Sequence, residues 1–99
     1  QGIGMALTEK FVYNKGKVET LNLSTYLLPT ANDIAHVETI IIEDPEPLGP
    51  WGAKGIGEPA IIPTAAAIAN AVSNAIGTEI NEIPITSEMV LEKLMKKEM

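Results

Sequence analysis

A glycine- and proline-rich segment, residues 44–57, restricts the folds open to this chain more than any other feature. It carries three prolines and four glycines. Both residue types disfavour the interior of helices and strands, so we predict a loop here. Regular structure therefore has to lie before residue 44 and after Glu58, where the longest helical pattern of the chain begins.

Residues 60–76 form that helical pattern. Its apolar side chains recur at helical spacing and share one face: Ala65, Ile68, Ala69, Val72 and Ile76. Gly77 is placed to end the helix. Pro59 and Pro63 leave two alternatives for its start: either Pro59 occupies the first turn, or the regular helix begins at Pro63.

Two shorter helices are also predicted. Residues 3–11 place apolar side chains at every fourth position, which indicates a helix of about three turns. A last helix follows Thr86, a plausible N-cap, with Glu88 in its first turn. Lysines gather near the C-terminal end of this helix, where they suit the helix dipole.

Three segments have the character of strands. The turn sequence of residues 14–17 predicts a short hairpin. Residues 37–43, which are rich in β-branched side chains, form the best strand pattern of the chain, and residues 80–85 form a short extended run. The expected fold is therefore mixed α/β, with three helices, a short hairpin and one or two further strands. Residues 1–99 are expected to form a single domain or fragment.

The composition limits the partners. A net charge of −6 without a basic run argues against nucleic acid. The chain has no cysteine, which excludes disulfides and thiolate-bound metal or iron–sulfur sites within it. No apolar run approaches the ~18–20 residues of a membrane-spanning helix, and nothing points to secretion, so we expect a cytoplasmic protein without a membrane partner.

The loop ends on a carboxylate, Glu58, which precedes Pro59. We expect an extended backbone at this residue and a carboxylate at the positive end of the following helix dipole, as suits a general base. A capped helix start with no catalytic role is the alternative interpretation. The glycine spacing fits neither an NTPase phosphate loop nor a dinucleotide-binding fingerprint. Trp51 is expected to anchor the loop on the core.

Several motifs resemble the C-terminal part of the molybdopterin-binding subunit of the xanthine dehydrogenase/aldehyde oxidase family. The loop carries the pattern P-x-G-P-x-G-A-K-G-I-G-E-P-A. Residues 1–9 are similar to the family's Q-G-x-G-x-A-L-x-E helix, and residues 22–33 to its N-x-x-x-Y-x-x-P-T-x-x-D stretch. The alanine-rich helix and the I-P-I-T segment before the last helix complete the match, which covers essentially the whole chain in order.

This resemblance implies a role for each residue of the loop. It places Glu58 beside the molybdenum as the catalytic base. It also implies that Gly55, Ile56 and Gly57 line the cofactor by backbone contact, that Lys54 helps to position the loop, and that Gln1 hydrogen-bonds the pterin. The cofactor would be molybdenum-molybdopterin, with the cytosine dinucleotide as one form of it, and this chain alone would bind none and supply no metal ligand.

The resemblance also implies a larger enzyme, a molybdenum hydroxylase that oxidises an aldehyde or N-heterocycle carbon with oxygen from water. The rest of the molybdenum subunit, iron–sulfur and flavin subunits and a small-molecule substrate would be its partners. The chain, which starts at Gln1, is expected to be an inactive fragment of this enzyme. A separate small subunit that completes a split enzyme and an interaction domain without chemistry are the alternatives. An exposed apolar helix face would also permit a homo-oligomer of the fragment.

Overall fold

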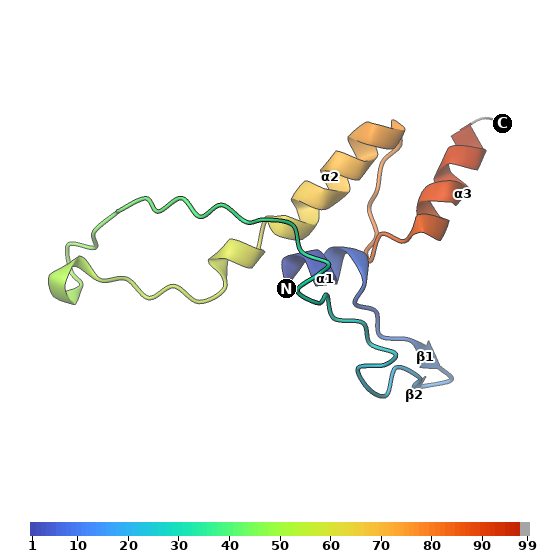
Figure 1. Cartoon of the computed structure of the whole chain (residues 1–99), viewed down its shortest axis with the longest axis horizontal. Coiled ribbons are helices and arrows are strands. Elements are labelled where there is room, and N and C mark those ends of the chain that lie inside the picture. Colours follow the sequence, from blue (N-terminus) through green and yellow to red (C-terminus); the bar gives the residue numbers. More distant parts are fainter. Residues whose placement is uncertain (98–99) are drawn as a thin grey trace.

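Two helices pack against each other in the middle of the molecule. The computed structural model describes residues 1–97, and in it α1 (Gly2–Leu7) lies against α2 (Thr64–Ile76). The two helices approach each other so closely at Gly2 that a Cβ on this residue would lie 2.5 Å from the Thr64 Cβ. Figure 1 shows α1 below the first turns of α2 in the middle of the molecule, with the hairpin on one side and a long loop on the other.

The buried core is small and joins segments from opposite ends of the sequence. Ala6, Ile80 and Ile85 are its buried apolar side chains. The Ile85 N–H donates a hydrogen bond of 2.7 Å to the Ala6 carbonyl, which fixes the segment after α2 beside α1. Ile80 is held near the end of α2, because its N–H donates to the Ser73 hydroxyl at 2.8 Å.

The remaining elements are short. The hairpin pairs β1 (Tyr13–Asn14) with β2 (Lys17–Val18) in antiparallel register. Two 3₁₀ turns, η1 (Pro50–Gly52) and η2 (Pro59–Ile61), lie in the loop, and α3 (Ser87–Lys97) closes the described chain.

Several predicted elements are confirmed. The hairpin turns at Lys15 and Gly16, both with positive φ, as its sequence requires. The Thr86 hydroxyl accepts a hydrogen bond from the Met89 N–H at 3.2 Å, so it caps α3. Gly77 ends α2 with a φ of 65°. The regular part of α2 begins after Pro63, which decides between the two predicted starts.

Three predictions about regular structure are wrong. The first helix stops at Leu7 rather than near Phe11, because the Thr8 hydroxyl bonds the Leu27 carbonyl at 2.8 Å and the chain turns away. Phe11 instead packs against Tyr26, with 4.8 Å between ring centroids. The predicted strand at residues 37–43 has no regular structure, because no other described segment pairs with it. Residues 80–85 likewise form no strand within the described range.

The molecule is open for its size. Its radius of gyration is 18.2 Å, whereas a compact domain of this length has about 13 Å. Its accessible surface is 8470 Å², against about 5,500 Å² for a compact monomer of this mass. Much of the apolar surface that a complete domain would bury is therefore exposed in this chain.

Residues 59–76 contribute to this apolar surface. They form an 18-residue helical segment with a mean hydropathy of 1.3, long and apolar enough by composition to cross a membrane. This corrects the expectation that no segment approaches that length. The regular helix α2 has only 13 residues, or about 20 Å, which falls short of the ~30 Å hydrocarbon core of a bilayer.

Candidate functional site

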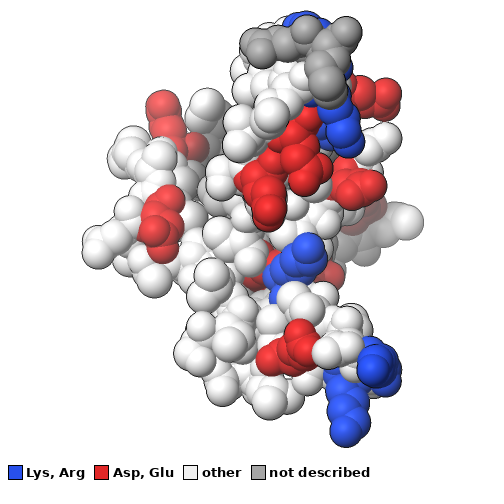
Figure 2. All heavy atoms as spheres, turned by 90° about the vertical axis from the view of Figure 1, so that its right-hand side faces the viewer, with Lys and Arg blue, Asp and Glu red and all other residues white. Residues whose placement is uncertain are grey.

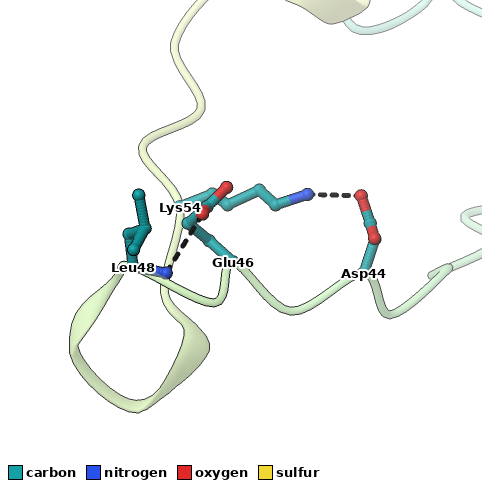
Figure 3. Close-up of polar contacts among 4 residues, drawn as sticks. All are labelled: Asp44, Glu46, Leu48 and Lys54. Atoms are coloured by element: carbon teal, nitrogen blue, oxygen red, sulfur yellow. Dashed lines mark hydrogen bonds and ion pairs between the residues drawn. The ribbon is translucent and has the colours of Figure 1, made fainter.

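The loop between residues 44 and 58 is closed at its base by an ion pair. The Lys54 ammonium pairs with the Asp44 carboxylate, and Figure 3 shows the two side chains reaching toward each other across the loop. The Glu46 N–H donates to the Gly52 carbonyl at 3.0 Å just beyond the pair. Glu46 also accepts a hydrogen bond from the Leu48 N–H at 3.1 Å (Figure 3). The loop therefore has a defined shape of its own.

Two glycines are required by that shape. A Cβ on Gly49 would lie 2.2 Å from the Ala53 carbonyl oxygen, which no side chain can accommodate. Gly52 has a φ of 78°, in the left-handed region that favours glycine. Trp51, between them, is fully exposed. The expectation that Trp51 anchors the loop on the core is therefore wrong for this chain, because a fully exposed side chain packs on nothing.

The segment Gly55–Glu58 differs from the loop base. A Cβ on either Gly55 or Gly57 would meet no atom within 4 Å, and neither glycine has a positive φ. Ile56 exposes 78% of its surface, and Glu58 is exposed as well. Within residues 1–97, no contact explains why glycine stands at residues 55 and 57.

The backbone of Glu58 does not have the predicted extended conformation. Its φ of −110° and ψ of 6° lie in the bridge region. The reason is the 3₁₀ turn that follows, in which the Ile61 N–H donates to the Glu58 carbonyl at 3.0 Å. Since α2 begins only at Thr64, its dipole is separated from the carboxylate by η2, and the Glu58 side chain makes no capping hydrogen bond.

Gln1 lies near the segment that follows Glu58. Gln1, Gly2 and Ile3 line a shallow hollow of about 280 Å³ together with Ala60, Ile61 and Thr64. The Gln1 side chain makes no capping hydrogen bond to α1. The hollow places Gln1 beside Ala60 and Ile61, and none of residues 54–58 lines it.

The other motif residues have contacts inside the chain. The Tyr26 hydroxyl donates to Glu9 Oε2 at 2.6 Å, and this hydrogen bond raises the pKa of Tyr26. The Asp33 carboxylate accepts hydrogen bonds of 2.7 Å from both the N–H and the hydroxyl of Thr30, which lower the pKa of Asp33. These motif residues therefore have a structural role inside the chain, which the sequence pattern alone did not predict.

A second hollow, of about 440 Å³, lies between α3 and the segment after α2. Two of its lysines donate to backbone carbonyls: Lys97 to that of Ile76, the last residue of α2, at 3.1 Å, and Lys93 to that of Glu79, after α2, at 2.8 Å. Figure 2 shows this face with acidic and basic side chains close together rather than a patch of one sign. Among the described residues, no three or more His, Asp or Glu lie where they could hold a metal ion.

Comparisons with known proteins agree with one another. Residues 1–35 match the molybdopterin cofactor-binding domain family. The chain is 43% identical over 94 residues to a putative xanthine dehydrogenase molybdenum-binding subunit of Escherichia coli, covering 93% of this chain and 12% of that protein. It is 41% identical to the gamma subunit of a 6-hydroxypseudooxynicotine dehydrogenase complex of Paenarthrobacter nicotinovorans, covering 94% of this chain and 12% of that protein.

A solved structure gives the same result. Quinoline 2-oxidoreductase from Pseudomonas putida 86 superposes with a TM-score of 0.87 at 35% identity, over 97% of this chain and 13% of that one. The chain thus spans about an eighth of the length of the proteins it matches.

Proposed function

Since the chain belongs to the xanthine dehydrogenase/aldehyde oxidase family, as part of its molybdopterin-binding subunit, we propose that it contributes Glu58 as the active-site base of a molybdenum hydroxylase. The enzyme would oxidise an aldehyde or N-heterocycle carbon with oxygen derived from water. The names of the relatives include substrates of both kinds, an aldehyde oxidoreductase and a quinoline oxidoreductase.

The contrast within the motif residues carries this proposal. Glu9, Tyr26 and Asp33 are engaged inside the chain. Within residues 1–97, no atom lies against the open side of Gly55 or Gly57, and the Glu58 side chain makes no capping hydrogen bond. No contact inside the chain requires glycine at residues 55 and 57, so these glycines permit a ligand to approach the backbone closely. The exposed Glu58 carboxylate, at the end of the same segment, can then reach that ligand.

The residues present fit a molybdopterin cofactor. Open space beside Gly55 and Gly57 leaves the backbone accessible, and backbone N–H groups can hold the phosphate of such a cofactor without a basic side chain. Gln1 and Ile56 would add contacts from the two sides of the site, and the cytosine dinucleotide is one form that this site would take. Lys54, which pairs with Asp44, would act by holding the loop.

Glu58 would remove and hold a proton during the reaction. When bound, the molybdenum cofactor supplies the two-electron oxidation. The Glu58 carboxylate is exposed and makes no capping hydrogen bond, so it is available to accept a proton. The bridge-region backbone and the prolines on its C-terminal side restrict its position.

The rest of the enzyme has to supply what this chain lacks. This chain contains no cysteine for an iron–sulfur cluster. Electrons would therefore leave through partner subunits that carry iron–sulfur clusters and flavin. The isolated chain would be inactive, and we place the complete enzyme in the cytoplasm.

Substitution of Glu58 by Gln in the complete enzyme tests this function. Removing a general base lowers kcat by about 10²–10⁴-fold, whereas the molybdenum content should remain that of the wild type. Glu46→Gln is the matched control, because Glu46 has a role only within the loop and its loss should leave most of the turnover. Near-wild-type kcat in fully loaded Glu58→Gln enzyme would remove this residue from the mechanism.

A further inference from the structure

Residues 37–43 combine exposed apolar side chains with an unpaired backbone. Ile40, Ile41 and Ile42 expose 79%, 83% and 85% of their surface. Within residues 1–97, no backbone hydrogen bond involves this segment, which runs as an open trace away from the helices (Figure 1). Unpaired peptide groups and β-branched side chains together are typical of a strand that lacks its sheet.

The order of the side chains shows how such a strand would be covered. Side chains of a strand alternate between its two faces, so Val37 and Ile41 fall on one face and Ile40 and Ile42 on the other. Glu38 and Glu43 are the charged residues, and they lie toward the ends. A strand with one face in water alternates apolar and polar residues, whereas an apolar run on both faces is typical of a strand covered on both sides.

The described chain cannot supply this environment. Its one hairpin has strands of two residues each, whereas residues 37–43 would extend about 23 Å as a strand. The chain spans 12% of the length of its xanthine dehydrogenase relative, so most of a complete subunit lies outside it.

We infer that residues 37–43 insert as a strand into a sheet of the rest of the molybdenum-binding subunit, which covers both faces of the strand. This inference rests on membership of the family and not on the role proposed for Glu58. It does have a consequence for that loop, because the strand ends at Glu43, directly before Asp44. The sheet would therefore fix the base of the loop, while Thr64 and Gly2 fix its other end.

Amide hydrogen exchange in the complete subunit tests the pairing. The amides of residues 38–43 should exchange at least ~100-fold more slowly than those of an unstructured peptide, as in a paired strand. Exchange at the unstructured rate would overturn the inference. Protection that is lost when the subunit is diluted from dimer to monomer would assign the partner strand to a second copy, and would also overturn it.

Two substitutions test the covering of each face. Ile41→Thr and Ile42→Thr keep a β-branched side chain but place a hydroxyl on opposite faces. Each should speed exchange of these amides about tenfold, and Glu38→Gln, near the strand end, should not. Faster exchange in only one isoleucine variant would overturn the covering of both faces. Glu58→Gln should leave the exchange pattern unchanged, so the failure of this inference is distinguishable from the failure of the proposed base.

Discussion

The Lys54 ammonium lies against the Asp44 carboxylate across the base of the loop that ends in Glu58. The two side chains expose 42% and 81% of their surface, and exposed ion pairs contribute only about 0–1 kcal/mol. The pair therefore holds the shape of the loop without adding much to the stability of the fold.

Breaking this pair should lower turnover modestly. We expect Lys54→Met and Asp44→Asn each to reduce kcat by less than about tenfold, and the double variant to lose no more than either single one, because both remove the same interaction. Steady-state kinetics with molybdenum analysis measure this. If Lys54→Met alone lost molybdenum, Lys54 would bind the cofactor rather than position the loop.

Alanine at Gly55 or Gly57 should separate folding from cofactor binding. Neither added Cβ meets an atom within 4 Å in this chain, so the melting temperature of the cofactor-free subunit should not change. Cofactor content should fall, because the methyl group would occupy the space of the approaching ligand. Equal molybdenum loading in both variants and the wild type would contradict close approach at this segment.

Gly2→Ala is expected to show the opposite behaviour. Its Cβ would lie 2.5 Å from the Thr64 Cβ, so α1 and α2 would have to separate. Overpacking of this kind costs about 1–3 kcal/mol, and the cofactor-free subunit should melt at a lower temperature. Gly16→Asn is the control, since nothing lies within 4 Å of Gly16 and Asn tolerates its positive φ.

The stabilisation provided by Asp33 should depend on pH. Hydrogen bonds from Thr30 hold the pKa of Asp33 below its ordinary value of about 3.9. A carboxyl whose pKa is depressed on folding stabilises the fold above its unfolded pKa, and this contribution disappears as the pH falls through the folded pKa. Asp33→Ala should lower the melting temperature at pH 6, and the difference from wild type should shrink below about pH 4. A difference that is constant with pH would exclude this carboxylate as its cause.

Gly77→Ala should destabilise the end of α2. The φ of 65° at Gly77 costs an alanine about 1–2 kcal/mol. Hydrogen exchange of the last turn of α2 would report this as faster exchange, while Gly77→Asn, which tolerates the left-handed region, should change it much less. Equal exchange in all three proteins would show that the left-handed cap contributes nothing.

The features that the sequence predicted correctly are those set by residues close together along the chain. The hairpin at Lys15 and Gly16, the cap at Thr86 and the end of α2 at Gly77 depend on residues close by, and all are confirmed. Family membership was also predicted, because the motifs span the whole chain in order.

Features that depend on more than the directly adjacent residues were not predicted. The strand pattern of residues 37–43 was interpreted without regard to a partner, and no described segment provides one. The expected backbone of Glu58 followed from Pro59 alone, whereas the hydrogen bond from Ile61 determines the observed conformation. Local propensity could not reveal that Trp51 is fully exposed.

The hydrogen bond from Ile85 to Ala6 has a consequence for synthesis. Because the core needs Ala6 and Ile85 together, it cannot close until the ribosome has released nearly all of this segment. Before Thr64 is made, α1 lacks its contact with α2 as well, and its six residues are too few for a stable helix in water. The nascent segment would therefore expose its apolar residues for most of its translation, and this is the period in which a chaperone would have the most to bind.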